Sequence, residues 1–224
     1  DSQRQQGFRL DRAPLMSCTL LRITERETRF IWCHHHLLLD GWSLPLILKQ
    51  VFSQYQSGVD TSQHGVNVTP YREYIRYLTE QDDVQALAWW QNKLSSVSEP
   101  SRLFIQHKDS VRDVRSRHYG HCRVALPETV FSRLKMFAST QRLTLNTLVQ
   151  GAWATLLNRY SRQSEVLFGA VVSGRPAILP QVEEMVGLFI NTLPVRVQNF
   201  QQAVVGFLHA LQRDQLDSRQ YEAV

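Results

Sequence analysis

The segment Cys33-His34-His35-His36-Leu37-Leu38-Leu39-Asp40-Gly41-Trp42-Ser43 decides the fold and carries the side chains best suited to chemistry. Residues 29–34 lead into it as an aromatic and β-branched run, which is typical of a strand. Beyond it, apolar residues recur at the spacing of one helix face, at Leu44, Ile47, Leu48, Val51, Phe52 and Tyr55. The sequence therefore predicts a strand, a loop with histidines and an aspartate, and a helix capped by Ser43 and ended by Gly58.

The histidine–aspartate loop, residues 35–43, allows a catalytic, a metal-binding or a purely structural interpretation. Imidazole has the side-chain pKa nearest neutrality, so His36 can accept a proton from an attacking amine or hydroxyl, or hydrogen-bond it into place. Asp40 can either orient an imidazole or form an ion pair that shapes the loop, and Gly41 permits a sharp turn. A metal site at His34, His36 and Asp40 is disfavoured, because consecutive residues at a strand end point to opposite faces.

The composition is that of a globular protein, with 224 residues of which 43% are hydrophobic and 20% charged. The net charge of +5 is scattered along the chain, so no nucleic-acid partner is expected. No apolar run approaches the roughly 20 residues of a membrane span, and no membrane association is expected. Cys18, Cys33 and Cys122 are widely spaced, which indicates neither a disulfide framework nor a metal site and favours a cytoplasmic location.

Strand and helix patterns alternate along the rest of the chain, which predicts an α/β fold. Further strands are expected at 14–23, 119–126, 165–172 and 186–197. Further helices are expected near 70–77, 82–94, 127–138, 144–157 and 202–221. The strand at 165–172 is so apolar that we expect both of its faces to be buried. Weak periodicity predicts an inter-lobe linker at 101–117, between an N-terminal lobe, 1–100, and a C-terminal lobe, 118–224.

Several motifs coincide, in order, with those of one family. His35-His36-Leu37-Leu38-Leu39-Asp40-Gly41 resembles the HHxxxDG signature of the condensation domains of nonribosomal peptide synthetases, members of an acyltransferase superfamily that includes chloramphenicol acetyltransferase. Residues 71–77 resemble that family's YxDYxxW helix, with Glu73 and Tyr77 as departures. Residues 168–176 resemble a strand that ends in a Gly-Arg-Pro turn, and residues 186–196 match GxFxNTxPxR. The resemblance spans nearly the whole chain.

This resemblance implies a two-lobed, chloramphenicol-acetyltransferase-like sandwich of mixed sheets flanked by helices, with the active loop at the lobe interface. Such domains are about twice as long, so the chain is expected to be truncated at both ends and inactive by itself. The arginine partner that the family implies for Asp40 is expected either in a part of the domain outside this chain or at Arg175, the only candidate within a motif named here. Heterocyclising relatives carry DxxxxD at the position of His35 to Asp40, which favours condensation, whereas epimerising relatives share HHxxxDG and stay an alternative.

The implied reaction is amide-bond formation in nonribosomal peptide biosynthesis, a bacterial route to antibiotics and other secondary metabolites. The amine of an acceptor aminoacyl thioester attacks the thioester carbonyl of a donor acyl or peptidyl group. The chain is expected to bind no cofactor itself, because phosphopantetheine arms of upstream and downstream peptidyl carrier (thiolation) domains deliver both substrates. An adenylation domain is expected in the same polypeptide. A catalytically inactive docking module and a free-standing acyltransferase that uses coenzyme A are alternatives.

The resemblance also assigns roles to single residues. His36 is the expected reactive residue, His35 its companion in the motif, and Asp40 the residue that shapes the loop. The backbone amide of Gly41 is expected to help stabilise the tetrahedral species. Substrate or structural support is expected from Trp42, Arg175 and Asn191.

Overall fold

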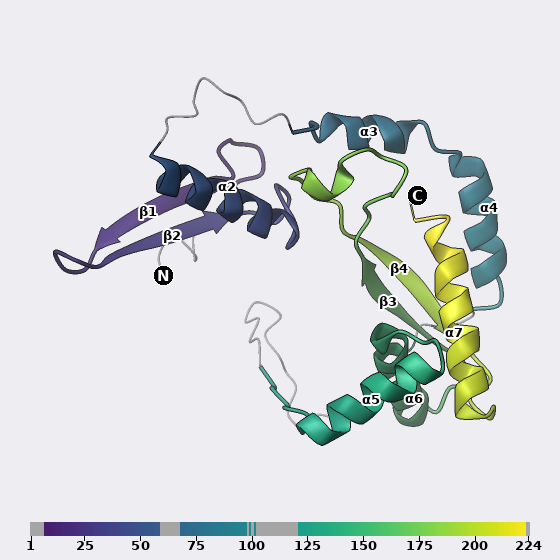
Figure 1. The fold of residues 1–224 in the computed structure, drawn as a ribbon. Helices are drawn as coiled ribbons and strands as arrows, with labels where there is room; N and C mark the ends of the chain where they lie inside the picture. Colours follow the sequence, from purple (N-terminus) through teal and green to yellow (C-terminus); the bar gives the residue numbers. More distant parts are fainter. Residues whose placement is uncertain (1–6, 59–67, 98, 100, 102–120, 223–224) are drawn as a thin grey trace, which may run out of the picture. The chain divides into compact units, whose positions relative to one another are not determined.

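The computed structural model describes residues 7–58, 68–97, 99, 101 and 121–222. Figure 1 shows helices and short two-stranded sheets, so the predicted α/β class is confirmed. None of the helices in the described part of the chain is long and apolar enough to cross a bilayer.

The chain divides into two compact units that each draw on separate stretches of sequence. The first unit holds residues 1–81 and 171–191, and the second holds residues 82–170 and 192–224. Apart from Ser101, the predicted linker lies outside the described residues. The predicted division into two consecutive lobes stays a prediction.

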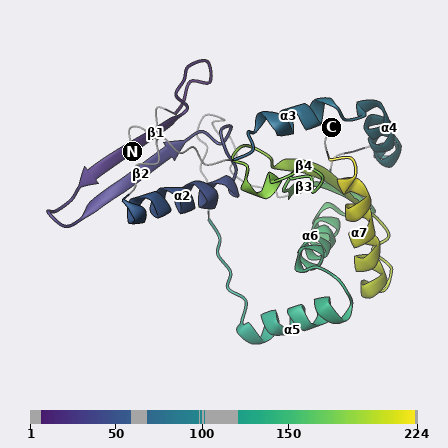
Figure 2. The ribbon, with the colours of Figure 1, turned by 45° about the horizontal axis from the view of Figure 1, so that its top comes forward.

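The first unit begins with an antiparallel hairpin of β1 (Met16–Arg22) and β2 (Thr28–His34), in which every residue of one strand faces a residue of the other. Figures 1 and 2 both show α2 (Ser43–Ser57) lying along this hairpin. The helix ends at Gly58, which adopts the left-handed conformation that glycine enters at least cost. The predicted strand, loop and helix are therefore confirmed.

A small aromatic core completes the first unit. It is built by α3 (Arg72–Thr79), the short 3-10 helix η2 (Val182–Glu184) and the segment that follows η2. Its buried members are Tyr74, Val182, Met185 and Phe189. The rings of Tyr74 and Tyr77 stack with centroids 6.4 Å apart, because residues three apart in a helix are neighbours on its surface.

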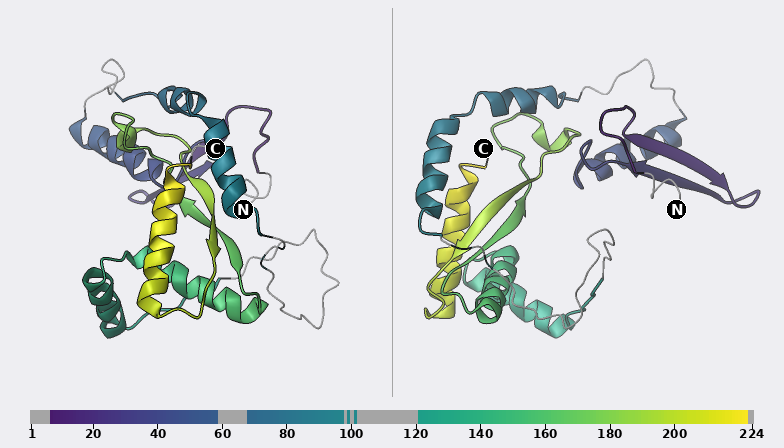
Figure 3. Two further views of the ribbon diagram at one scale, coloured as in Figure 1. Left: turned by 90° about the vertical axis from the view of Figure 1, so that its right-hand side faces the viewer. Right: turned by 180° about the vertical axis from the view of Figure 1, so that it is seen from behind.

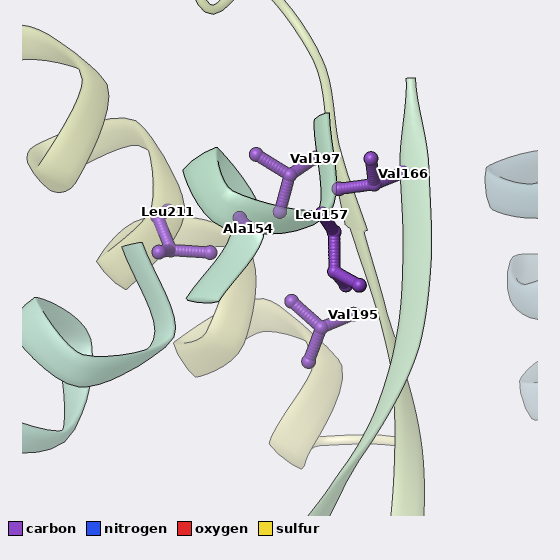
Figure 4. Close-up of a cluster of buried hydrophobic side chains, with 6 residues drawn as sticks. All are labelled: Ala154, Leu157, Val166, Val195, Val197 and Leu211. Atoms are coloured by element: carbon purple, nitrogen blue, oxygen red, sulfur yellow. The ribbon is translucent and has the colours of Figure 1, made fainter. Parts of the chain in front are cut away.

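The second unit contains α4 (Asp83–Leu94), α5 (Glu128–Thr140), α6 (Leu145–Ser161) and α7 (Val204–Arg219). These helices accompany a sheet in which β3 (Val166–Val172) pairs with β4 (Asn191–Val197). Figure 4 shows the apolar cluster at its centre, formed by Ala154, Leu157, Val166, Val195, Val197 and Leu211.

Helices α4 and α7 run side by side in both views of Figure 3. Trp90 Nε1 donates a hydrogen bond of 3.0 Å to the Tyr221 carbonyl, and Lys93 Nζ lies 2.7 Å from Asp214 Oδ1. Arg196 forms an ion pair with Glu165 at 2.6 Å. These polar contacts thus join neighbouring elements of the second unit.

Two strand predictions are wrong in part. The strand predicted at 186–197 begins only at Asn191, because the backbone groups of Gly187 and Phe189 bond to Asp40 rather than to a strand. The strand predicted at 119–126 is irregular over residues 121–126, and residues 119 and 120 lie outside the described part.

Burial also departs from the sequence pattern in two places. Strand β3 is not buried on both faces, since Val166 is fully buried whereas Val171 is 68% exposed. On α2, the predicted apolar face ends in exposed residues, namely Val51, Phe52 and Tyr55. Hydrophobic periodicity predicted the element correctly in both cases, but it did not predict what covers the element.

Candidate active site

Hydrogen bonds shape the first half of the histidine–aspartate loop. The His35 N–H donates to the Leu15 carbonyl at 2.9 Å, and the Leu38 N–H donates to the His35 carbonyl at 3.1 Å. The Leu37 N–H donates to Nδ1 of His35 at 3.1 Å, so a neutral His35 carries its proton on Nε2. The His35 ring therefore helps to hold the turn, and only its Nε2 is left for other partners.

Asp40 lies at the buried end of the loop and is only 1% exposed. Its Oδ1 accepts from the Ser43 N–H at 3.0 Å and lies 2.9 Å from the Ser43 hydroxyl, and its Oδ2 accepts from the Phe189 N–H at 3.1 Å. Burial raises the pKa of Asp40, but the bonds from Ser43 and Phe189 and the Arg175 charge together bring this pKa below its ordinary value. Asp40 is therefore an ionised, fully engaged carboxylate.

Arg175 is the cation that faces Asp40, as the sequence proposed. Its Nη2 lies 3.5 Å from Asp40 Oδ1, and the side chains of both residues are almost fully buried. Its Nη1 donates to the Met185 carbonyl at 3.0 Å and also to the Val182 carbonyl. The guanidinium carbon lies 3.9 Å from the centroid of the Phe189 ring, a cation–π contact. Of the two roles open for Asp40, the contacts match the ion pair that shapes the loop.

Ser43 joins the loop to residues 187–189 and is completely buried. Its hydroxyl lies 2.9 Å from Asp40 Oδ1 and 2.9 Å from the Gly187 carbonyl oxygen, and it accepts from the Gly187 N–H at 3.1 Å. The Asp40 N–H also donates to the Gly187 carbonyl, at 3.1 Å. The predicted capping role of Ser43 is wrong, because it is the first residue of α2 and the Asp40 side chain accepts its N–H.

Tyr71 supports the same segment of residues 187–189. Its hydroxyl donates to the Leu188 carbonyl at 2.5 Å, and its ring meets Phe189 edge to face at 5.2 Å. Burial and the Asp40 charge raise the pKa of Tyr71, so it remains a neutral hydrogen-bond donor near pH 7.

Two glycines are required by close approaches in this centre. Gly174 has a φ of +61°, and a Cβ there would lie 1.7 Å from the Phe189 carbonyl oxygen. A Cβ on Gly187 would lie 2.1 Å from the Tyr71 ring. The turn predicted at Gly174 is confirmed, whereas Gly187 has no left-handed backbone and is needed because an aromatic ring packs against it.

His36, the candidate reactive residue, differs from Asp40 both in exposure and in the contacts of its side chain. Its side chain is exposed and makes no hydrogen bond, ion pair or ring contact with another residue in the described part of the chain. Gly41 is exposed too, and a Cβ on it would meet nothing within 4 Å, so the fold of this chain does not require a glycine at that turn. Trp42 is 58% exposed. His36, Gly41 and Trp42 thus lie on the accessible part of the loop.

Asn191 is half-buried at the start of β4, and its supporting role stays a prediction. Among the residues that the structure describes, no three His, Cys, Asp or Glu side chains are grouped to hold a metal ion. The His34 ring instead packs on Trp32 with centroids 5.2 Å apart.

The sequence and the fold of this chain are similar to those of known proteins. The family model described as "Condensation domain" matches residues 1–224. The chain belongs to the condensation-domain family. The predicted family is therefore confirmed.

Similar condensation-domain sequences occur within large bacterial synthases. The chain is 43% identical over 223 residues to a linear gramicidin synthase of Brevibacillus parabrevis, covering 98% of this chain and 4% of that protein. It is 40% identical over 224 residues to chondramide synthase cmdD of Chondromyces crocatus, covering 99% of this chain and 6% of that protein. The chain thus spans only a small part of the relatives it matches.

Solved structures show the same fold at lower sequence identity. The X-domain from teicoplanin biosynthesis superposes with a TM-score of 0.81 at 21% identity, over 98% of this chain and 51% of that one. The first condensation domain of the calcium-dependent antibiotic synthetase, in complex with substrate analogue 2a, gives a TM-score of 0.69 at 18% identity, over 96% of this chain and 50% of that one. The chain therefore covers about half of each of these folds.

Some residues of this condensation-domain centre were missed as parts of the site by sequence reasoning. Ser43 was interpreted as a helix cap, and Gly187 and Tyr71 were considered only as members of the motifs that contain them. One signal was present for Ser43, because a serine three residues after an aspartate is placed to exchange local hydrogen bonds with it. The long-range contacts of Gly187 and Phe189 left no such local signal.

Proposed function

We propose that this chain provides the reactive loop of an amide-forming condensation domain in nonribosomal peptide synthesis. The acceptor amine attacks the donor thioester carbonyl, the new C–N bond forms, the C–S bond breaks, and the proton lost by nitrogen ends on the released thiol. One observation carries this proposal: within the histidine–aspartate loop, Asp40 is buried and hydrogen-bonded, whereas His36 is exposed.

The chemical demand on the protein is modest. A thioester is already activated, so no covalent enzyme intermediate is needed, and holding two tethered substrates together supplies much of the rate. His36 then accepts the amine proton or hydrogen-bonds the amine into position. The Gly41 backbone amide is placed on the same accessible stretch and can hydrogen-bond to the tetrahedral species.

Asp40 is not the proton acceptor in this proposal. Its oxygens already accept from Ser43, Phe189 and Arg175, and hydrogen bonds and charge lower its pKa. A carboxylate of low basicity in a buried ion pair is poorly suited to take a proton from an amine. Its proposed role is to fix the shape of the loop, together with Arg175. His35 holds the turn through Nδ1.

The proposed partners are those that tethered substrates require. Carrier domains upstream and downstream deliver donor and acceptor on phosphopantetheine arms, and an adenylation domain in the same polypeptide selects the amino acid. The small share of each synthase that this chain matches supports a multidomain setting. The cytoplasm is the proposed compartment.

A docking module is the second candidate function. It is favoured by the likeness to the X-domain solved in "Complex of the X-domain and OxyB", with a TM-score of 0.79 at 20% identity. A docking role alone gives no reason for an exposed His36 on a loop that is anchored by the buried residues Asp40 and Ser43. Epimerising domains share the HHxxxDG signature. An epimerisation can be distinguished from condensation and from docking because its product is an inverted α-carbon without a new amide bond.

The test uses the complete synthetase that carries this chain, with ATP and a mixture of the twenty proteinogenic amino acids. Peptides released from the carrier domains are identified by mass spectrometry, with their stereochemistry. His36→Ala should lower the rate of amide formation by about 10²–10⁴-fold with the fold retained. The matched control is His121→Ala, at an exposed histidine outside the loop, which should leave the rate unchanged.

Three results would contradict the proposal. Full turnover by His36→Ala removes this histidine from the mechanism. Inversion of an α-carbon without a new amide bond supports epimerisation. A wild-type synthetase that loads its carriers but forms no amide bond at this domain supports the docking role.

A further inference from the structure

We propose that Ser43 is a positioning residue for the amide-forming step: its hydroxyl locks the histidine–aspartate loop onto residues 187–189 and so determines where His36 is presented. This inference rests on the proposed function and deepens it. Ser43 itself is buried beneath the loop and is assigned no contact with substrate.

The Ser43 hydroxyl has two acceptors within reach, Asp40 Oδ1 and the Gly187 carbonyl oxygen, each at 2.9 Å. The Gly187 N–H donates to the Ser43 oxygen, and the Gly187 carbonyl already accepts the Asp40 N–H. The hydroxyl proton is then best placed on Asp40 Oδ1, because an ionised carboxylate is a stronger acceptor than a carbonyl. Ser43 thereby links a peptide group of one segment to the carboxylate of the other.

No other described group can replace this hydroxyl. Ser43 is fully buried, so its removal leaves the Gly187 N–H without a partner and without water to replace it. Hydrogen bonds in such a buried polar network fix the geometry of the groups they join, and the loss of one member leaves its partners less well placed. The Tyr71 bond to the Leu188 carbonyl fixes the far side of this segment but does not reach Gly187 N–H.

The position of His36 depends on this lock because its own side chain is not held. Its ring has no hydrogen-bond, ion-pair or ring partner among the described residues. The backbone on either side therefore places it. On one side the loop is tied by the His35 N–H to Leu15, and on the other it is tied by Asp40 and Ser43 to Gly187 and Phe189. Loosening the second tie should misplace the imidazole, and a small misplacement is costly in catalysis.

The experiment compares Ser43→Ala and Ser43→Cys with Ser53→Ala, an exposed serine on the same helix, in the complete synthetase. The acceptor is supplied as the N-acetylcysteamine thioester of the amino acid that the intact synthetase incorporates, which allows kcat and KM to be separated. Hydrogen exchange followed by mass spectrometry reports on peptides that contain residues 185–190.

Ser43→Ala should lower kcat about ten- to a hundredfold, leave KM near its wild-type value and accelerate exchange at 185–190 only. Ser43→Cys keeps a weaker hydrogen-bonding group and should recover part of kcat. Ser53→Ala should match the wild type. If Ser43→Ala does not fold, Ser43→Cys takes its place and must show the same loss of kcat with faster local exchange.

An unchanged kcat in the folded Ser43→Ala or Ser43→Cys variant overturns the positioning role, whatever the exchange shows. An effect on KM alone overturns it as well. If the wild-type synthetase forms no amide bond, the proposed function fails and the catalytic role of Ser43 fails with it, but faster exchange at 185–190 in Ser43→Ala would still show that the lock exists.

Discussion

The polar centre of the first unit and the apolar cluster of the second unit hold their elements together by different means. Around Asp40, buried polar groups are held by directional contacts, including the ion pair with the Arg175 guanidinium and the hydrogen bond from the Phe189 N–H, although Arg175 Nε has no hydrogen-bond partner among the described residues. Around Val166 and Ala154, which are fully buried, contact is non-directional and is spread over many methyl groups.

This difference fits the reactive role that we propose for the histidine–aspartate loop, which is anchored by the polar centre. Apolar packing tolerates changes of shape as long as volume is kept, so it fixes position only loosely. A hydrogen-bond network restricts the geometry of the groups it joins. Loss of one member leaves its partners buried without a hydrogen bond, which costs free energy. The proposed reaction requires a defined geometry of the histidine–aspartate loop, and its anchors Asp40, Ser43 and Arg175 make directional contacts of the kind that provides it.

The largest expected contrast between the two regions comes from Arg175→Ala and Val166→Ala. Removing Arg175 leaves the Asp40 charge buried without its counter-ion, which should cost about 3–5 kcal/mol of unfolding free energy. Removing two methyl groups at Val166 should cost about 1–3 kcal/mol. The measurement is the urea midpoint at which peptides of this chain become susceptible to a brief protease pulse in the complete synthetase. Equal losses for the two variants would contradict the distinction between the regions.

A second contrast compares two glycines of the first unit. Gly174→Ala introduces a Cβ that would lie 1.7 Å from the Phe189 carbonyl oxygen at a φ of +61°, and it should cost at least about 2 kcal/mol. Gly41→Ala meets open space and should change the unfolding free energy by less than about 0.5 kcal/mol. The same protease-pulse assay separates them.

The Gly41 variant also carries functional information. If Gly41→Ala keeps wild-type stability but loses amide formation, the glycine serves the reaction and not the fold. A large loss of stability in Gly41→Ala would show instead that this turn is constrained in a way that its open surroundings do not reveal.

Local sequence was sufficient to predict the elements that carry the loop. An aromatic strand before His35 and a helical stripe after Ser43 are properties of neighbouring residues, and both were confirmed. The motif resemblance added the family and the pairing of Asp40 with Arg175, which lie far apart in the sequence and in contact in the structure.

The features that the sequence did not predict depend on contacts with residues far away in the chain, and the local sequence pattern gives no information about such contacts. Residues 186–190 form an apolar run of the kind found in buried strands, yet Gly187 and Phe189 turn their backbone groups to Asp40. Val171 on β3 is apolar and exposed, because a pattern indicates which face can be buried and not which one is. Propensity was overruled at both places by tertiary contacts.

The smallest expected effect is a loss of stability at acidic pH. It is expected for the polar centre, which contains Asp40, and not for the apolar cluster. The pKa of Asp40 is lower in the folded chain than its ordinary value, so the unfolded chain takes up the proton first as the pH falls. The stabilisation is complete above the ordinary carboxyl pKa near 4 and is lost as the pH falls from there through the lower folded value. Asp40→Asn should therefore be less stable than the wild type at pH 7, and the gap between the two should narrow in acid.

The matched control is Asp11→Asn, an exposed carboxylate paired with Arg9 at the surface, where the expected change is small. Urea midpoints are measured for the three proteins from neutral to acidic pH. A gap between wild type and Asp40→Asn that stays constant down to the lowest pH at which the protein folds would show that the Asp40 carboxylate acts there through its shape and hydrogen bonds alone. The polar centre would then resemble the apolar cluster in holding the loop by complementarity without charge.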